Sequence, residues 1–450
     1  MLKRNLTTEE IAKFEVRNYR FPDIQIAERY SRENLYPYLF SHSIGYVGNL
    51  DEEKLQEILS SQNLESNETI FTYSNGFLNG KTGIEYVYDE KLRGLFGKKI
   101  YEVDASGRLL QEKQMIPAVA GEDIFTSLDL SSQKVAYDEL NNRRGAVVAV
   151  DINDGSIVTY VSSPSFSVNK IANGLTQNEF DELINDDDKP FFDRAAQGRY
   201  SPASTIKPAI GLFGIDKDIL DWEYTIQDPG FFILPEDGRI YRGWKKGGHG
   251  EINLKDAIIE SSNTFFFSLA YQTEIEELRA HLSNFGFGKN VCDDCFMPDN
   301  GLLPSPRWKM NTHNFGWFKG DTVNVGVGQG YINATPIQLA YYSAFLATKG
   351  NINKFSFVQD SKNANKNIFN SKNITNIDWD NIHESMIGVI ESPKGTAGRL
   401  RSLKDYVIAA KSGTVELVST ETKEDYQIIR ETEGKSCLLY TSPSPRDSSE

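Results

Sequence analysis

Long apolar runs are missing from this 450-residue sequence, which contains no stretch of about 18 or more apolar residues. The sequence therefore predicts no helix that spans a membrane. Its start, from Met1 to Glu10, also lacks the apolar segment of a signal peptide. By themselves these two absences indicate a cytoplasmic protein, an interpretation that the motifs described below reverse.

Positive charge is also scarce. Lysine and arginine total 48 against 63 aspartates and glutamates, which gives a net charge of −15 and a pI of about 5.0. This balance argues against nucleic acid as a partner. The acidic residues are spread along the chain, so we interpret them as a source of solubility. A hydrophobic content of 39% describes a globular protein, and the length allows two or more domains.

Cysteine occurs only three times. Cys292 and Cys295 form a Cys-x-x-Cys pair, and Cys437 lies close to the end of the sequence. A zinc site would need a second pair of ligands nearby, and no second cysteine pair exists. A redox motif would need a strand-to-helix setting that the sequence does not show. An incidental pair or a loop closed by a disulfide is the favoured interpretation.

The pattern of the sequence changes near Gly121. Residues 1–120 mix turns with short strand-like runs, and they hold no group of residues that indicates chemistry. Beyond them, two strand-like runs joined by a short Asp- and Gly-containing turn predict a β-hairpin over 145–162. Hairpins and helices in one domain suggest an α+β or α/β sandwich. The strand-like runs of the first part are 43–48, 71–73, 85–88 and 99–103, with a polar helical pattern over 51–59. The predicted helices of the second part are 178–188, 253–271, 274–287 and 334–349.

The last residues, 436–450, have no periodicity and resemble translated sequencing-adapter sequence. We predict that they are a non-native tail and exclude them from the expected fold.

Ser204 and Lys207 form a Ser-x-x-Lys motif ahead of an apolar run. A helix that begins near Ala203 would place the hydroxyl and the amine on one face, one turn apart. An amine in that place can take the proton of the hydroxyl and make it a good nucleophile. Alone the motif is weak, because an N-cap serine followed by a solvated lysine gives the same pattern.

Two further motifs follow in order and change this assessment. Ser261 and Asn263 form Ser-x-Asn inside the helical stretch 253–271, where we predict a break between two helices. Lys411 opens Lys-Ser-Gly-Thr after the apolar run 406–410, which reads as a strand. Each motif is weak by itself. The ordered trio is the signature of penicillin-recognising serine acyltransferases.

The chemistry accounts for each residue type. Ser204 would attack a peptide or lactam carbonyl, with Lys207 as its base because burial near other cations lowers an ammonium pKa. Ser261 would relay a proton to the leaving nitrogen, and the amide of Asn263 would both donate to and accept from the substrate. Lys411 would supply positive potential for a terminal carboxylate.

The rest of the third motif would bind substrate. Ser412 and Thr414 offer hydroxyls to the substrate carboxylate, and Gly413 allows a close backbone approach. The backbone N–H groups of Ser204 and Thr414 would form the oxyanion hole.

On these motifs the sequence resembles the penicillin-binding protein 2 family, the elongation-type class B D,D-transpeptidases of Gram-negative bacteria. The resemblance covers residues 1 to about 435 and extends beyond the trio to 41–48, 80–85, 145–161, 244–250, 320–331, 334–336 and 395–397. It implies an α+β multidomain fold. Residues 1–120 would form a mixed α/β, dimerisation-type pedestal without catalytic function. Residues 121–435 would form a transpeptidase domain with an antiparallel sheet sandwiched by helices.

The resemblance also implies the activity and the location. Members cross-link peptidoglycan stem peptides during cell elongation and rod-shape maintenance, are acylated by β-lactams, and work beside a glycosyltransferase. They face the periplasm from the inner membrane. The family begins with a membrane-spanning helix and ends with a further strand pair and a closing helix, none of which we find here. We therefore expect truncation at both ends, with a membrane contact only through the missing helix.

Truncation would affect the third motif directly. In the family fold the Lys-Ser-Gly-Thr strand is an edge whose next neighbour is the first missing strand. We therefore expect an incomplete sheet in which this strand is unpaired, so that Lys411 and Thr414 are not held in place.

Family members often hold a zinc ion beside the active site. Here Asp228 and His249 remain at two ligand positions, but Gly243 and Ser262 occupy the other two. Two ligands cannot complete a tetrahedral site, so we expect neither zinc nor any other cofactor. His249 is then expected to be a hydrogen-bonded loop histidine.

Two alternatives stay open. A β-lactamase or D,D-carboxypeptidase would use the same trio with water as acceptor, although no glutamate after Ser-x-Asn is placed to activate that water. A scaffold that keeps a folded pedestal and lacks catalysis is the second.

Overall fold

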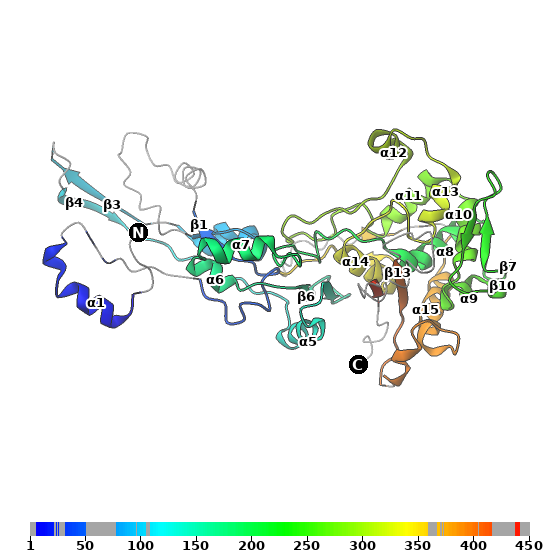
Figure 1. Cartoon of the computed structure of the whole chain (residues 1–450), viewed down its shortest axis with the longest axis horizontal. Helices are drawn as coiled ribbons and strands as arrows, with labels where there is room; N and C mark the ends of the chain where they lie inside the picture. Colours follow the sequence, from blue (N-terminus) through cyan, green and yellow to red (C-terminus); the bar gives the residue numbers. More distant parts are fainter. Residues whose placement is uncertain are drawn as a thin grey trace. The chain divides into compact units, whose positions relative to one another are not determined.

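The computed structural model describes residues 6–21, 24, 26, 32–50, 78–95, 97–104, 109–358, 367–369, 371, 373–403, 405–415 and 437–441. The chain divides into two compact units (Figure 1). Unit 1 comprises residues 1–124 and 165–191, and unit 2 comprises residues 125–164 and 192–450. The segment 165–191, which the sequence analysis placed after the pedestal, thus packs with unit 1. No helix in the described part of the chain combines the length and the apolar character needed to cross a bilayer.

Unit 1 consists of short elements and small antiparallel pairs. Strand β1 pairs with β2, and β3 forms a longer hairpin with β4. Few of its described apolar side chains are fully buried, and Phe40, Val47, Ile84 and Phe166 are among them. The elements are α1 (Thr8–Glu15), η1 (Asn18–Arg20), β1 (Val47–Asn49), β2 (Leu78–Gly80), α3 (Gly83–Val87), α4 (Asp89–Arg93), β3 (Lys98–Val103), β4 (Leu109–Ile116), α6 (Val168–Asn173) and α7 (Gln177–Asn185).

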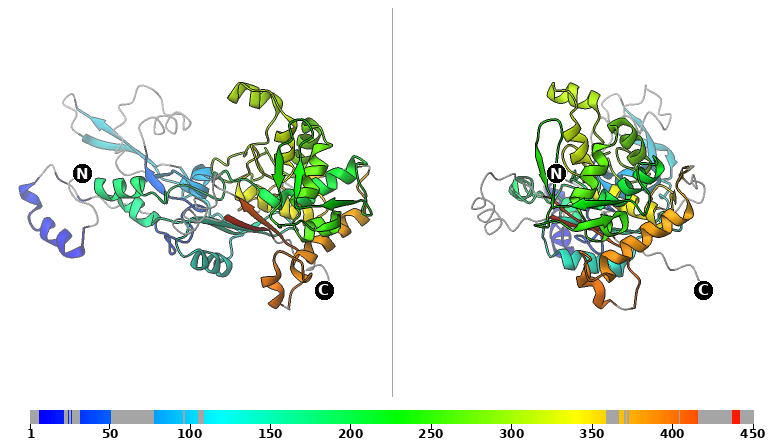
Figure 2. Two further views of the ribbon diagram at one scale, coloured as in Figure 1. Left: turned by 45° about the vertical axis from the view of Figure 1, so that its right-hand side comes forward. Right: turned by 90° about the vertical axis from the view of Figure 1, so that its right-hand side faces the viewer.

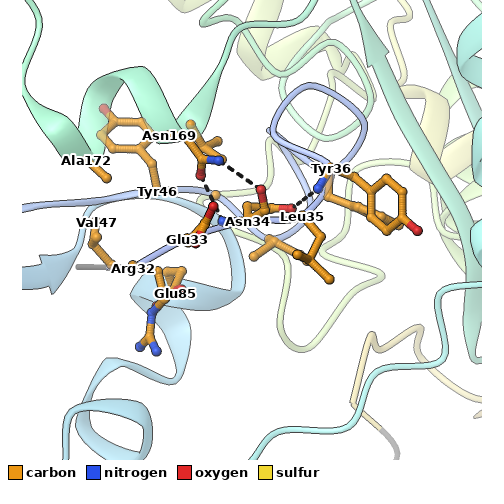
Figure 3. Close-up of a pocket in the computed structure, with 14 residues that line it drawn as sticks. Arg32, Glu33, Asn34, Leu35, Tyr36, Tyr46, Val47, Glu85, Asn169 and Ala172 are labelled. Atoms are coloured by element: carbon orange, nitrogen blue, oxygen red, sulfur yellow. Dashed lines mark hydrogen bonds and ion pairs between the residues drawn. The ribbon is translucent and has the colours of Figure 1, made fainter. Parts of the chain in front are cut away.

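A cavity of about 290 Å³ lies within unit 1 (Figure 3). Asn169 of α6 closes one side of it, exchanging two hydrogen bonds of 2.8 Å with the backbone of Asn34. Arg32 and the nearly buried Glu85 form an ion pair of 2.8 Å at its rim. These contacts explain why 165–191 belongs to unit 1. The side chain of Asn169 completes a wall of the cavity whose other residues come from much earlier in the chain.

Unit 2 holds the main core, which is built on apolar helices. All residues of α8 (Lys207–Asp216) except Asp216 are buried, as expected for a helix that is apolar on every side. Helices α10 (Asn263–Tyr271) and α14 (Pro336–Ala347) bury most of their length as well. Burial of one large apolar side chain such as Phe213 stabilises the fold by about 1.5–3 kcal/mol.

Other helices and small strand pairs surround this core (Figures 1 and 2). Strand β5 forms a hairpin with β6, β7 pairs with β10, and β8 pairs with β9. The remaining elements are α5 (Leu130–Leu140), β5 (Gly145–Val150), β6 (Ile157–Ser163), η2 (Ala203–Ile206), β7 (Thr225–Asp228), β8 (Phe231–Ile233), β9 (Ile240–Arg242), β10 (Gly250–Asn253), α9 (Leu254–Ile259), α11 (Ile275–Asn284), α12 (Pro306–His313), α13 (Lys319–Val325), β11 (Asn351–Ile352), β12 (Asn367–Ile368), α15 (Asn376–Glu391), η3 (Gly398–Ser402), β13 (Lys411–Val415) and β14 (Cys437–Thr441).

Most predicted elements of unit 2 are confirmed. The hairpin over 145–162 is β5 and β6, and the helical stretch 253–271 is broken between α9 and α10. Cys292 and Cys295 are joined by a disulfide, one of the two interpretations that the sequence favoured. The strand predicted over 406–410 instead begins at Lys411.

Two predictions are wrong. The strand-like run 85–88 belongs largely to helix α3, where Gly83 at φ +61 allows the chain to turn into the helix. The strand of the third motif is not unpaired, because β14 pairs antiparallel with all five residues of β13 (Figure 2). Residues 437–441 of the segment excluded as a tail therefore form part of a sheet. The rest of that segment, the helical pattern 51–59 and the strand-like run 71–73 lie outside the described residues.

Candidate active site

The turn that carries Ser204 is held by a close backbone contact. Ser204 lies in the 3₁₀ turn η2, and Lys207 is the first residue of α8. The backbone N–H of Ala203 donates to the carbonyl of Gly328 at 2.8 Å. A Cβ on Gly328 would lie 2.1 Å from the carbonyl oxygen of Ala203, and Gly328 has a φ of +71. Only glycine fits there, so Gly328 fixes the position of the turn.

Ser261 and Asn263 lie at the break between α9 and α10. Ser261 has a φ of +57, a left-handed conformation that costs about 1 kcal/mol for a residue with a side chain. Ser262 is the N-cap of α10, and its hydroxyl accepts from the N–H of Phe265 at 3.2 Å. The break turns the chain so that Ser261 and Asn263 can face the same neighbour.

That neighbour is Lys207, whose side chain is fully buried. Its Nζ donates to the carbonyl of Ser261 at 2.8 Å and to Oδ1 of Asn263 at 2.7 Å. It also lies 3.3 Å from Oγ of Ser261. The first two motifs therefore meet through one amine, although 54 residues separate Lys207 from Ser261.

Lys411 of β13 approaches the same hydroxyl from another direction and is also fully buried. Its Nζ donates to Oγ of Ser261 at 2.8 Å and to the carbonyl of Ser412 at 3.0 Å. Since β13 also contacts η2, the third motif lies beside the turn of Ser204. Oγ of Ser261 is thus the atom on which both buried lysines converge.

Two buried amines beside the same hydroxyl cannot both be charged cheaply. Burial lowers the pKa of Lys411 to about 7. Burial, and then the charge of Lys411, lower the pKa of Lys207 well below its usual range, while Asp228 opposes the shift. These shifts favour loss of the proton from Lys207 before Lys411, and a deprotonated Lys207 can accept a proton.

The rest of the third motif lines β13. Ser412 is half-buried, Gly413 is buried and Thr414 is exposed. Oγ of Ser412 lies 2.7 Å from Oγ1 of Thr396, so one of the two hydroxyls donates to the other. The sequence analysis assigned no role to Thr396. The run 395–397 was the only signal for it, and only the fold shows that its hydroxyl reaches the third motif.

Asp228 and His249 form a cluster behind the Ser-x-Asn turn. Oδ2 of Asp228 accepts from Oγ of Ser262 at 2.7 Å and lies 2.6 Å from Nδ1 of His249. Oδ1 of Asp228 accepts from the N–H of Gly230 at 2.7 Å. The side chains of Asp228 and His249 are 1% and 2% exposed. His249 is therefore the hydrogen-bonded loop histidine that the sequence predicted, and the contact with Ser262 was not foreseen.

The residues of this cluster do not fit a tetrahedral zinc ion. Ser262 offers a hydroxyl, which is already bound to the carboxylate that a metal would need. A Cβ at Gly243 would lie 3.2 Å from the carbonyl oxygen of Gly230 and 3.5 Å from Oγ1 of Thr264, and glycine supplies no donor. Among the described residues, no group of three or more His, Cys, Asp and Glu side chains is placed to hold a metal.

A serine at a helix start, a buried amine one turn on, and a second buried amine on a neighbouring strand are the arrangement expected of penicillin-recognising serine acyltransferases. The comparison with protein families agrees. Residues 145–430 match the penicillin-binding protein transpeptidase domain, and residues 1–126 match the penicillin-binding protein dimerisation domain. The chain belongs to the penicillin-binding protein transpeptidase family.

Curated relatives are similar to this chain over most of its length. The chain is 37% identical over 432 residues to the peptidoglycan D,D-transpeptidase MrdA of Acinetobacter baumannii. It is 33% identical over 434 residues to the MrdA protein of Escherichia coli K12. These alignments cover 94% of this chain in both cases. The chain spans 62% of the length of the first relative and 67% of the second.

Solved structures show the same fold. The chain is similar to Pseudomonas aeruginosa PBP2 in complex with WCK 5153, with a TM-score of 0.76 and 31% identity over 94% of this chain and 85% of that one. It is also similar to Helicobacter pylori PBP2 in its complex with MreC, with a TM-score of 0.77 and 27% identity over 90% of this chain and 74% of that one.

Proposed function

We propose that the chain is a D,D-transpeptidase that cross-links peptidoglycan stem peptides through an acyl-enzyme on Ser204. The observation that carries the proposal is the convergence of Lys207 and Lys411 on Oγ of Ser261, at 3.3 and 2.8 Å. Such a group can take a proton from the nucleophile and return it to a leaving nitrogen. The family and the relatives named transpeptidases support the same reaction.

In the acylation step, Oγ of Ser204 attacks the carbonyl carbon of the penultimate D-Ala, and its proton passes to the neutral amine of Lys207. The backbone N–H groups of Ser204 and Thr414 would stabilise the oxyanion. The tetrahedral intermediate collapses as the C–N bond breaks. The leaving nitrogen takes a proton relayed through Ser261, and the terminal D-Ala departs.

In the second step, the amine of a neighbouring stem peptide attacks the ester carbonyl. Lys207 takes the proton of this amine as the new peptide bond forms, and the hydroxyl of Ser204 is restored. Asn263 would hold the substrate amide. Lys411 and the hydroxyls of Ser412 and Thr414 would hold its carboxylate, with Gly413 giving room for a close approach.

The proposal also gives a role to each of the two parts of the chain. Residues 121–435, apart from the segment 165–191 that packs with unit 1, would carry the reaction, and residues 1–120 would serve as a pedestal without catalytic function. We place the site at the periplasmic face of the inner membrane, beside a glycosyltransferase of the elongation machinery. The complex of the Helicobacter pylori relative with MreC supports a role for partners in this family. Co-purification of the chain with a candidate glycosyltransferase, set against the chain lacking residues 1–120, tests the partner.

Labelling with a fluorescent penicillin tests the reaction. A β-lactam acylates the same hydroxyl, so the chain should acquire one stable label that survives denaturing electrophoresis. Ser204→Ala should abolish the label, and the surface variant Ser402→Ala should keep it. A label that survives Ser204→Ala contradicts the proposal.

The same assay separates the alternatives. Rapid multiple turnover of the penicillin, without a lasting label, would favour a β-lactamase or D,D-carboxypeptidase. A folded chain that is never labelled would favour the scaffold. The nearest glutamate to the Ser-x-Asn turn, Glu260, is bound by Lys245 at 3.0 Å and Lys394 at 3.2 Å, which leaves it poorly suited to activate a deacylating water.

A further inference from the structure

Three aromatic side chains of unit 2 form a cluster that remains open to solvent. Trp308 and His313 belong to α12, and Tyr331 lies in the loop that follows Gly328. Their ring centroids are 5.1–5.3 Å apart in all three pairs. Trp308 and Tyr331 are half-buried, and His313 is exposed. We call these three side chains the α12 platform.

The platform is held in place although α12 projects from the rest of unit 2 (Figure 1). Lys309 is the one residue of α12 that is buried, and it forms an ion pair of 2.6 Å with Asp321 of α13. Asp321 also accepts from the N–H of Phe318 at 2.8 Å, just before α13. The ammonium of Lys309 lies 5.5 Å from the centre of the Tyr331 ring. The rings are therefore fixed in one arrangement before any ligand arrives.

The polar ends of the platform are free. Among the described residues, none accepts from the indole N–H of Trp308, and none forms a hydrogen bond with the hydroxyl of Tyr331. Trp317, a few residues away, differs because its indole N–H donates to Oγ1 of Thr322 at 2.8 Å. A tryptophan that only fills space usually pairs its N–H when it is buried. Trp308 keeps this donor available.

The platform lies close to the nucleophile turn. The carbonyl of Gly328 accepts from the N–H of Ala203, and Tyr331 follows three residues later. Three residues of extended chain span at most about 10 Å. Tyr200 and Ala334 also exchange backbone hydrogen bonds of 2.9 and 2.8 Å, which keep the loop alongside the segment that leads to the turn. Tyr331 therefore stands within a few residues' length of the reacting hydroxyl.

We propose that the α12 platform binds a sugar ring of the glycan strand that carries the donor stem peptide. The inference rests on the proposed function. In that substrate about four residues separate the sugar from the carbonyl that is attacked, and they span at most about 14 Å. With this carbonyl at the nucleophile, the sugar that bears the stem is within reach of the platform.

The chemistry of the platform fits a sugar. An aromatic face carries partial negative charge, and the C–H groups on one face of a sugar ring are partly positive, so the two stack. The free indole N–H and phenol hydroxyl suit sugar hydroxyls. The ammonium behind Tyr331 is already paired with Asp321, so it offers no charge for an ionic ligand. A neutral ring with hydroxyls at its edge uses every group of the platform.

The first test measures binding and needs no activity. Chitotetraose, a neutral oligomer of N-acetylglucosamine, should bind the intact chain with a dissociation constant on the order of 1 mM in a ligand-observed NMR titration. Trp308→Ala and Tyr331→Ala should each weaken binding by about 5- to 10-fold, and Tyr331→Phe, which keeps the ring, by about twofold. The control is Phe125→Ala, which removes an aromatic side chain of unit 2 that is 82% exposed and should change nothing.

The second test compares two donors, a free pentapeptide and the same pentapeptide on a glycan strand. Trp308→Ala should lower kcat/KM for the glycan-linked donor by about 5- to 10-fold more than for the free peptide, mainly through KM. A change in the nucleophile turn alone would lower both values by the same factor. Equal losses for the two donors therefore overturn the inference.

The binding results decide in the same way. No saturable binding of chitotetraose at about 10 mM, or equal binding by the unmodified chain and Trp308→Ala, overturns the inference and would leave an apolar partner protein as the occupant. Binding that depends on the platform in a chain that neither takes up penicillin nor cross-links would refute the proposed function and leave a saccharide site. If circular dichroism shows that Tyr331→Ala does not fold, Trp308→Ala decides, because α12 buries only Lys309.

Discussion

Two lysines buried around one serine hydroxyl are the central feature at the scale of residues. Within the described part of the chain no ion pair joins a carboxylate to Lys207 or Lys411, and both lysines are fully buried. Burial is the main cause of the lowered pKa of both lysines. The fold thus accepts an unfavourable electrostatic environment at the one place where a neutral amine is chemically useful.

This arrangement predicts a bell-shaped dependence of the acylation rate on pH. Below the lowered pKa of Lys207 the amine is protonated and cannot take the proton of Ser204, so the rate falls on the acid side. Above about 7, the pKa of Lys411, the charge that attracts the substrate carboxylate is lost, so the rate falls on the alkaline side. The second-order rate constant for acylation by penicillin should fall on both the acid and the alkaline side of its maximum.

Variants assign the alkaline limb. Lys411→Arg keeps a positive charge at all accessible pH values, so this limb should move above pH of about 9 even if the maximum rate is lower. Lys394→Arg, at an exposed lysine paired with Glu260, should leave the limb in place. An alkaline limb that stays near 7 in Lys411→Arg would show that another group produces it.

A second prediction concerns the base. Lys207→Arg can still donate to the carbonyl of Ser261 and to Asn263, but a guanidinium does not deprotonate in proteins. The acylation rate should therefore fall by about 10²- to 10⁴-fold while the chain stays folded. Stopped-flow labelling and circular dichroism measure the two effects. Lys255→Arg, at a surface pair with Glu384, should change neither.

At the scale of elements, the nucleophile turn depends on one glycine contact. Gly328 combines a positive φ with a blocked Cβ position against the carbonyl of Ala203. Gly328→Ala should therefore displace η2, lower the free energy of unfolding by more than the about 1–2 kcal/mol of a left-handed residue alone, and slow labelling of Ser204.

Two glycine controls separate these causes by thermal unfolding. Gly238 has a φ of +73 but open space around its Cβ position, so Gly238→Ala should show only the conformational cost. Gly316 has neither constraint, so Gly316→Ala should be neutral. Equal losses at Gly328 and Gly238 would mean that the contact with Ala203 is unimportant.

Much of the site could be predicted at this scale because the motifs are local. A serine and a lysine three residues apart at a helix start must lie on one face, and a helix break in 253–271 lets Ser261 and Asn263 face the same neighbour. The family resemblance implied that Asp228, His249 and Ser262 lie together, but their hydrogen bonds could not be predicted, because Asp228 and Ser262 are 34 residues apart and meet only in the folded chain. The partner of β13 was missed for a similar reason. A strand of five residues without alternation carries no periodic signal, and its pairing is a tertiary property.

At the scale of the whole molecule, the two units differ in how much apolar surface they bury. Most of the buried apolar side chains among the described residues belong to unit 2, and α8, α10 and α14 each bury several of them. The slowest amide hydrogen exchange should therefore occur in these helices, and the β3–β4 hairpin of unit 1 should exchange sooner. Mass spectrometry of the intact chain measures both.

Acylation should change the rate of amide hydrogen exchange only near the site. A penicillin bound to Ser204 should slow exchange in η2, in the Ser-x-Asn turn and in β13, where its contacts form. Exchange in β3 and β4 should not change. Equal slowing in the hairpin would indicate that the ligand orders the whole chain and not the site alone.

The discontinuity of unit 1 has a consequence for synthesis on the ribosome. Residues 1–124 cannot complete their unit until α6 and α7 have emerged, and the β5–β6 hairpin of the other unit is made before them. Lys411 reaches Ser261 only after a further 150 residues have been added. The Ser261–Lys411 contact therefore cannot form before β13 has been synthesised, and by then both segments of unit 1 have emerged.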